Sequence, residues 1–241
     1  MQISESPLRI GFDLDGVLAD FASAYHAMEV SLFGSGTATR PSQPEDKDEG
    51  PPAAGGPPGE PVVVTESRRR TAAVWQIITS MPDFWTMLRP TEEGAVRRIH
   101  ELTLRHRWEV FFITQRPATL GETVQRQTQR WLIAQGFDMP SVLVIEGSRG
   151  AAAGALRLDY HVDDNARNCL DVLSDARARP ILIVPAEDAV TPRKARSLGI
   201  GVANTIGGCL DILDRTSTAR QQPVVLQKLA AMVGWSQRFA R

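Results

Sequence analysis

Residues 9–21 read RIGFDLDGVLADF, and this stretch indicates both a fold and a site. An apolar run ending at Phe12 leads into Asp13 and Asp15, and Gly16 follows. Apolar residues before a glycine turn are typical of a buried strand, so both carboxylates would lie at its carboxyl end. Two carboxylates held this close repel each other unless a cation or a proton intervenes. We therefore expect a metal ion here and chemistry on an anion; the alternative is a solvated turn.

The composition is that of an ordinary folded chain of 241 residues, 42% of them hydrophobic. The formal net charge of −1 creates no field that would favour nucleic acid or an anionic membrane. Cys169 and Cys209 have no metal-binding spacing and form no disulfide framework. No apolar run approaches the roughly 18 residues of a membrane span, and the first residues lack a signal-peptide pattern. We therefore expect a cytoplasmic protein with neither a nucleic-acid polymer nor a membrane as partner.

Short apolar runs alternate with helix-length segments along most of the chain. A capping box over 119–122 predicts a helix that stops at Gly136, and residues 165–178 form a further helix pattern. That second pattern has Cys169, Leu170, Val172 and Leu173 on one broad face. Apolar strands separated by helices are typical of a parallel sheet covered on both sides, which is an α/β fold. The predicted strands are Arg9–Phe12, Trp108–Thr114, Val142–Ile145, His161–Asp163, Ile181–Val184 and Ile200–Ala203.

Two segments interrupt this alternation. Residues 19–107 are too long for a simple crossover and predict a small cap with helices over Ala19–Leu32 and Glu66–Ser80. Within the cap, residues 34–61 are crowded with glycine, proline and acids, which predicts a disordered insertion. The α/β core would then comprise residues 1–18 and 108–241. At its end, residues 221–235 predict an amphipathic helix that docks on the core or contacts a second copy in a homodimer.

Polar residues follow several of the predicted strands. Because the carboxyl ends of parallel strands meet at one edge of a sheet, these side chains would converge there. Four carboxylates at one edge would repel strongly, and a hard divalent cation with oxygen ligands relieves that repulsion, most often Mg²⁺ beside a substrate phosphate. Each residue also has an ordinary structural alternative, such as a helix cap at the aspartate pair. The converging residues are Asp13, Asp15, Thr114, Arg116, Arg149, Asp163 and Asp164.

These motifs resemble, in type and order, those of the haloacid dehalogenase (HAD) superfamily of phosphohydrolases. The Asp13-x-Asp15 pair, Thr114 and the Asp163-Asp164 pair are similar to three of its motifs, while Arg149-Gly150 stands where the superfamily usually has Lys-Gly. More narrowly, residues 15–21 and the stretch PDFWTMLRPTEEGAV at 82–96 resemble the 5′(3′)-deoxyribonucleotidase branch. The resemblance implies a Rossmann-like, HAD-like core with a small helical cap inserted after the first strand.

The resemblance also implies an activity and roles for the residues. It implies a Mg²⁺-dependent phosphomonoesterase that passes through an aspartyl-phosphate and dephosphorylates nucleoside 5′-monophosphates, so its partner would be a small phosphorylated metabolite. Asp13 would be the nucleophile and Asp15 the acid and base. Asp13, Asp15 through its main-chain carbonyl, and Asp163 would hold the metal, with Asp164 supporting them. Thr114 and Arg149 would bind phosphate with help from Arg116, and Arg149 keeps the charge of lysine with a bulkier shape.

Substrate choice is the least determined feature. Phe21, Tyr25, Trp75 and Trp85 lie in the predicted cap, where they would stack on a base or simply pack the cap. We expect His161 to point away from the site. The alternatives are a HAD phosphatase for another small phosphate ester, or a non-catalytic phospho-ligand-binding or signalling module. Receiver domains also gather acids, a threonine and a basic residue, but they are about half this length and have no cap.

Overall fold

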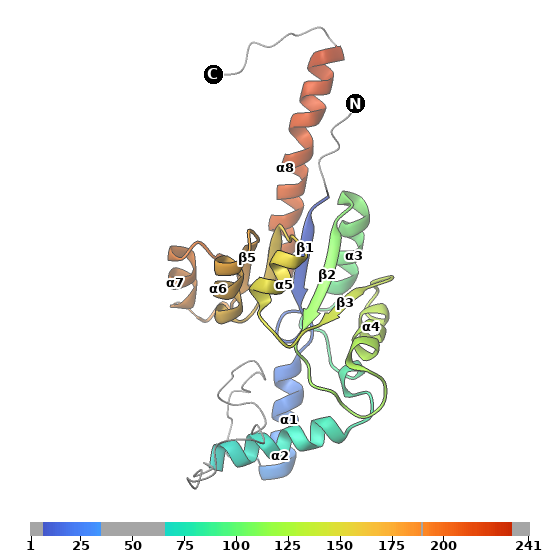
Figure 1. Ribbon diagram of the computed structural model, residues 1–241, viewed down its shortest axis with the longest axis vertical. Helices are drawn as coiled ribbons and strands as arrows, with labels where there is room; N and C mark the ends of the chain where they lie inside the picture. The colour runs from blue at the N-terminus through green and yellow to red at the C-terminus, as the bar shows by residue number, and fades with distance from the viewer. Residues whose placement is uncertain (1–6, 35–65, 189, 233–241) are drawn as a thin grey trace.

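One parallel six-stranded sheet lies at the centre of the protein (Figure 1). The computed structural model describes residues 7–34, 66–188 and 190–232, with side chains up to Arg220. The strand order is β3-β2-β1-β4-β5-β6. The α/β fold class and all six predicted strands are confirmed, with ends shifted by one or two residues. The strands are β1 Arg9–Asp13, β2 Glu109–Thr114, β3 Ser141–Val144, β4 Tyr160–Asp163, β5 Arg179–Ile183 and β6 Gly201–Ala203.

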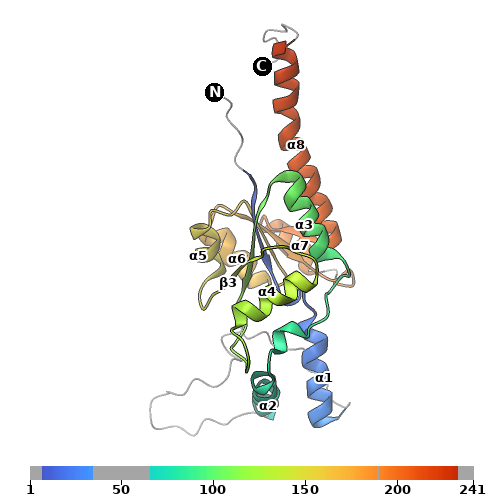
Figure 2. The same cartoon turned by 90° about the vertical axis from the view of Figure 1, so that its right-hand side faces the viewer.

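Helices cover both faces of the sheet (Figure 2). On one face, Ile10 and Phe12 of β1 belong to a core shared with α3 (Ala95–His106), α4 (Val124–Ala134) and α8 (Ile206–Met232). On the other face, Ile113 and Leu182 belong to smaller cores with α5 (Arg149–Ala155), α6 (Ala166–Asp175) and α7 (Thr191–Ser197). Burial on both faces explains why the strands read as continuous apolar runs instead of alternating ones.

The two predicted cap helices are present as α1 (Phe21–Phe33) and α2 (Glu66–Ser80), beyond the carboxyl end of β1 (Figure 1). The predicted insertion falls, except for Gly34, outside the described residues. The two chain segments that join the cap to the sheet pair with each other: Asp20 N donates to Arg89 O at 2.8 Å and Thr91 N to Leu18 O at 2.9 Å. The turn that carries the two aspartates therefore continues directly into the base of the cap.

A short 3₁₀ helix, η1 (Phe84–Thr86), is fastened to α4 by hydrogen bonds of tryptophan and glutamine side chains. Trp85 N donates to Gln127 Oε1 at 3.1 Å, and Trp85 Nε1 donates to the Pro117 carbonyl at 3.0 Å. Trp131 Nε1 on α4 donates to the Leu88 carbonyl at 2.7 Å. The indole N–H groups of Trp85 and Trp131 thus find acceptors at the junction between cap and core.

The predicted start of α4 is wrong by about one turn. The N-cap is Thr123, whose side chain accepts from Arg126 N, and the Thr119 hydroxyl instead bonds the Gln127 side chain. Gly121 has a positive φ of 95°, which breaks the helical path that a cap at Thr119 would need. The predicted stop is confirmed, because Gly136 follows the helix with φ 96°.

The helix that follows β4 has a narrower buried apolar face than predicted. Asn165 caps α6, and Cys169 and Val172 are buried as expected. Leu170 and Leu173, however, are 39% and 40% exposed. A short helix that packs on a sheet buries only one side of its surface. The prediction therefore assigned too many residues to the buried face.

The C-terminal helix differs from its prediction as well. Residues 221–232 continue α8 instead of forming a separate helix, and residues 233–235 lie outside the described part of the chain. The first half of α8 packs on the core through Cys209, Leu210 and Leu213, whereas its end extends beyond the sheet in both views (Figures 1 and 2). No helix among the described residues is long and apolar enough to cross a membrane.

Close packing of α5 against α6 depends on one glycine. A Cβ added at Gly150 would lie 2.3 Å from the Asp171 carbonyl oxygen and 2.7 Å from Asp175 Cβ, so no other residue fits there without moving backbone. Gly154, one turn later in the same helix, would place its Cβ no closer than 3.4 Å to any neighbour.

These two glycines give a matched pair of substitutions. We expect Gly150→Ala to destabilise the fold by about 1–3 kcal/mol, because overpacking must push α5 away from α6. Gly154→Ala is expected to be neutral or to stabilise by up to about 1 kcal/mol, because alanine favours helix. Urea unfolding midpoints of the two variants check this, and equal stability of the two would contradict the packing described.

Candidate active site

The strand register brings Asp13 and Asp163 side by side. β1 pairs with β4 so that Phe12 lies opposite Val162, and the next residue on each strand is an aspartate. On the other side of β1, Asp13 lies opposite Ile113, so Thr114 is one residue further along β2. The converging strand ends expected from the sequence therefore do meet at one edge of the sheet.

Gly16 allows the turn after β1 to approach the next aspartate. Its φ is +83°, and a Cβ added there would lie 2.0 Å from Asp164 Oδ2. The turn closes through Gly16 N donating to Ala19 O at 2.9 Å and Leu18 N donating to Leu14 O at 2.8 Å. Glycine is thus required here both for the backbone conformation and for the space that Asp164 occupies.

Asp163 is fully buried, and its carboxylate is surrounded by donors. Its Oδ1 accepts from Asn165 N at 2.8 Å and from Asn168 Nδ2 at 3.2 Å, and its Oδ2 lies 3.0 Å from His161 Nε2. A buried carboxylate is tolerated only when its oxygens are hydrogen-bonded, and these contacts also fix the direction in which it points.

Three carboxylates and one guanidinium form the centre of the site. Oxygen atoms of Asp13, Asp163 and Asp164 lie within 4.8 Å of one another. Arg149, which is 1% exposed, places Nη2 2.6 Å from Asp13 Oδ1 and Nε 3.7 Å from Asp163 Oδ2. One guanidinium balances only one of the three negative charges, which leaves a formal excess of two. We call these three aspartates the acidic cluster.

The start of α5 aims Arg149 at the acidic cluster. Ser148 caps the helix by accepting from Ala151 N at 3.0 Å, and its hydroxyl donates to Asp171 Oδ2 on α6 at 2.7 Å. Gly150 N donates to the same oxygen at 3.1 Å. Residues on both sides of Arg149 are therefore anchored to α6, so that its side chain has a fixed origin.

The acidic cluster fits a hard divalent cation. All three candidate ligands are carboxylate oxygens, close together and mostly buried, and they carry two more negative charges than Arg149 neutralises. Oxygen ligands and a charge excess of this size suit Mg²⁺ or a similar ion, whereas zinc sites in proteins usually include histidine or cysteine. The cluster contains Asp164 and not the Asp15 carboxylate, so Asp15 could contribute only its main-chain carbonyl.

Thr114 and Arg116 lie at the end of β2, and both are buried. The Arg116 guanidinium bonds the Asp15 carboxylate with Nε at 2.8 Å from Oδ2 and Nη2 at 2.7 Å from Oδ1. Its Nη1 donates to Thr128 Oγ1 at 3.0 Å, and its centre lies 4.7 Å from the Trp85 ring. Arg116 thus holds Asp15, and Trp85 of η1 covers it.

The aromatic residues of the cap pack on one another. Phe21 is 5.4 Å from Trp75, 5.8 Å from Tyr25 and 5.7 Å from Trp85 between ring centroids. All four side chains are buried, which matches the packing alternative for this state of the protein. Contact of any of them with a substrate stays a prediction.

Cys169 is fully buried near the acidic cluster. Burial, and then the nearby carboxylates of Asp163, Asp164 and Asp13, raise the pKa of its thiol. Burial alone raises the pKa of Cys209 to about 12. Both cysteines are therefore neutral thiols at physiological pH, and neither is disulfide-bonded.

The prediction for His161 is wrong, because its ring contacts the Asp163 carboxylate instead of pointing away. The two residues are separated by one position on β4, and alternate residues of a strand share a face, so this contact was available from the sequence. Asn168, Asp171 and Thr128 were also missed. Thr128 and Asp171 contact residues 12 and 23 positions away through helix packing, for which no local signal exists, whereas Asn168 contacts Asp163 only five positions away.

The sequence matches no known family profile and no curated protein. Solved structures do resemble the chain. A provisionally named β-phosphoglucomutase from Thermotoga maritima has a TM-score of 0.52 at 16% identity, covering 86% of this chain and 99% of its own. A HAD family hydrolase from Deinococcus radiodurans, solved with bound phosphate and sodium, has 0.54 at 12%, covering 88% and 97%. A hydrolase from Pseudomonas syringae has 0.52 at 14%, covering 87% and 99%.

This chain has the HAD-like fold. At these identities the likeness extends to the fold alone, and it does not distinguish the 5′-nucleotidase branch from others.

The charge excess at the acidic cluster predicts a metal-dependent gain in stability. Millimolar Mg²⁺ should raise the melting temperature of the wild-type protein, because a cation that binds only the folded state stabilises it. Asp163→Asn should lose most of that increase, whereas Asp211→Asn, which changes an exposed carboxylate on α8, should keep it. Scanning calorimetry with EDTA and with Mg²⁺ checks this; an equal shift in both variants would exclude the cluster as the metal site.

Proposed function

We propose that the protein is a Mg²⁺-dependent phosphomonoesterase that acts through an aspartyl-phosphate on Asp13, with nucleoside 5′-monophosphates as substrates. The observation that carries the proposal is the acidic cluster with Arg149 at the carboxyl edge of a HAD-like sheet. The order of motifs in the sequence supports the same activity. The nucleotide preference rests on the resemblance of residues 15–21 and 82–96 alone.

In the first step, a carboxylate oxygen of Asp13 attacks phosphorus, and the bond from phosphorus to the leaving oxygen breaks. Asp15, which enters this step as the carboxylic acid, donates its proton to that oxygen. Arg149, already 2.6 Å from Asp13, orients the attacking carboxylate and binds phosphoryl oxygens together with Thr114. Mg²⁺, held by Asp13, Asp163 and the Asp15 carbonyl with Asp164 beside them, would supply the positive charge that lets two anions approach.

In the second step, Asp15 takes a proton from water while the water oxygen attacks phosphorus. The bond between phosphorus and the Asp13 oxygen breaks, which releases inorganic phosphate and restores the Asp13 carboxylate. Asp13 and Asp15 both return to their starting protonation states, so the reaction needs no reactant besides the phosphate ester and water.

We propose that Arg116 positions Asp15 for both proton transfers. Its hydrogen bonds from Nε and Nη2 to the carboxylate fix the plane of Asp15, and Thr128 and the Trp85 ring contact the guanidinium as well. The earlier expectation was that Arg116 binds phosphate directly. The contacts it makes in this structure favour the positioning role.

Substitution of Asp13 tests its role as the nucleophile. Asp13→Asn should lower kcat for phosphate release by about a thousandfold or more, because an amide oxygen cannot attack phosphorus. Asp211→Asn should keep wild-type activity. The assay follows phosphate release from a panel of nucleoside monophosphates and other small phosphate esters, with Mg²⁺ or with EDTA.

The panel also separates the alternatives. Faster turnover of nucleoside 5′-monophosphates supports the nucleotidase assignment, and faster turnover of another ester replaces it with a different HAD phosphatase. Mg²⁺-dependent nucleotide binding without phosphate release would favour the non-catalytic alternative. Activity that persists in Asp13→Asn would overturn the mechanism.

Substitution of Arg116 tests whether it positions Asp15. Arg116→Lys should lower kcat by about tenfold or more with little change in KM, because lysine keeps the charge but loses the two-point contact with Asp15. A conservative partner, Thr128→Ser, retains the hydroxyl that Arg116 contacts and should stay within about twofold of wild type. If KM rises tenfold while kcat is unchanged, Arg116 binds substrate instead of positioning Asp15.

A further inference from the structure

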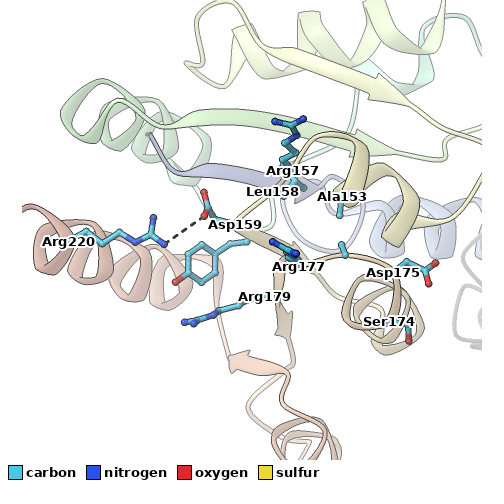
Figure 3. A pocket seen from close by; sticks show the side chains of 12 residues that line it. Ala153, Arg157, Leu158, Asp159, Ser174, Asp175, Arg177, Arg179 and Arg220 are labelled. Carbon is cyan, nitrogen blue, oxygen red and sulfur yellow. Dashed lines mark ion pairs between the residues drawn. The ribbon is translucent and has the colours of Figure 1, made fainter. Parts of the chain in front are cut away.

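A cavity of about 850 Å³ lies at the edge of the sheet opposite to the acidic cluster (Figure 3). Tyr160, which begins β4, lines the cavity, whereas Asp163 ends the same strand. The four residues of β4 span roughly 10 Å between the amino end of the strand, at the cavity, and its carboxyl end, at the acidic cluster. A molecule in this cavity would therefore not touch the acidic cluster. Its volume falls within the range of about 300–1,000 Å³ that is typical of small-molecule sites.

Four arginines from different segments surround this cavity (Figure 3). Arg157 follows α5, Arg177 follows α6, Arg179 begins β5, and Arg220 lies on α8. The two acidic lining residues are Asp159 and Asp175, so the lining carries a formal charge of +2. The cavity is therefore an electropositive hollow in a protein whose formal net charge is −1.

The positive charge of this hollow is largely uncompensated. Asp159 already accepts a hydrogen bond from Arg9 N at 2.9 Å and pairs with Arg220 at 3.7 Å. Among the described residues, the side chains of Arg157, Arg177 and Arg179 form no ion pair and no hydrogen bond. All three side chains are exposed and line the cavity, so water solvates their guanidinium donors in the free protein and the oxygens of an anion could replace that water.

Among the described residues, none of these arginines donates a side-chain hydrogen bond to a carbonyl at a helix end. α5 and α6 both end beside the cavity, and arginine is favoured at helix C-termini. However, the last carbonyls of α5 accept from the backbone N–H groups of Leu156, Arg157 and Leu158, and the Leu156 carbonyl accepts from Arg9 Nε at 2.7 Å. The Val172 carbonyl of α6 accepts from Ala176 N in the same way.

The remaining lining is apolar. Leu158 and Tyr160, which are 4% and 8% exposed, contribute to the walls, and the half-buried Ala176 adds a methyl group. A ligand that matches this cavity would combine anionic oxygens, which the arginines bind in pairs, with a ring or carbon skeleton against the apolar wall.

We propose that this cavity is a second binding site, separate from the acidic cluster, for a phosphorylated organic anion with two or more negative charges. Arg157, Arg177 and Arg179 bind its phosphate oxygens, and the wall formed by Leu158 and Tyr160 contacts its organic part. Arg220 stays paired with Asp159 and borders the site.

Calorimetric titration of the full chain with ADP and with inorganic pyrophosphate, both in EDTA, tests this proposal. EDTA removes the metal on which the proposed phosphatase depends, so the result stands apart from the proposed function. Wild type should bind both probes, and ADP more tightly, because only ADP has an organic part. Arg177→Gln with Arg179→Gln should weaken both affinities by about tenfold or more, since charge-assisted hydrogen bonds are lost.

The matched control is Arg193→Gln with Arg196→Gln, which removes the same charge from exposed positions on α7 and should leave both affinities within about twofold. If the cavity variant does not fold, as thermal unfolding would reveal, the single variant Arg157→Gln carries the test with the same expected direction. No binding by wild type, or equal loss in the cavity and control variants, would overturn the proposal. Equal affinity for ADP and pyrophosphate would overturn the part assigned to the apolar wall.

Discussion

Repulsion among three clustered carboxylates, two of them buried, is the constraint on which the rest of this structure depends. Asp13, Asp163 and Asp164 bring their oxygens within 4.8 Å of one another, and Arg149 neutralises only part of their charge. Buried charge is tolerated when it is paired and hydrogen-bonded, and the residues around these carboxylates provide such contacts. His161, Asn165 and Asn168 satisfy Asp163, Gly16 leaves space for Asp164, and the anchoring of α5 to α6 keeps Arg149 against Asp13.

A second chain of contacts connects this chemistry to the cap. Asp15 is bonded to Arg116, Arg116 lies over Trp85, and Trp85 packs within the aromatic cluster of Phe21 and Trp75. The segment that carries the two aspartates also pairs, through Ala19 and Pro90, with the segment that returns from the cap. In the proposed mechanism, substrate selection by the cap and proton transfer by Asp15 would therefore share one packed junction, and a substitution in the cap would alter the proton transfer without touching phosphate.

Local patterns in the sequence were sufficient for the sheet, the cap helices and the aspartates. Apolar runs ending in aspartate or threonine identified the strand ends, because backbone periodicity and burial are local properties. The partner of Arg116 was not predictable in this way, since Asp15 lies in the turn after β1, 101 residues away in sequence. The cap of α4 was placed at Thr119 because its motif fits, but the positive φ of Gly121, which excludes it, depends on contacts with Asp83. His161 was missed although the alternation of β4 places it beside Asp163.

Covalent phosphorylation of Asp13 is the central claim, and direct trapping of that intermediate tests it best. The variant Asp15→Asn with p-nitrophenyl phosphate and Mg²⁺ is suited to this, because that leaving group needs no proton, whereas release of phosphate from Asp13 requires the base. Borohydride reduction after rapid quenching converts an aspartyl-phosphate to homoserine. The account predicts homoserine at position 13 in the peptide map. An unmodified Asp13 during burst release of p-nitrophenol, or modification at another residue, would contradict it.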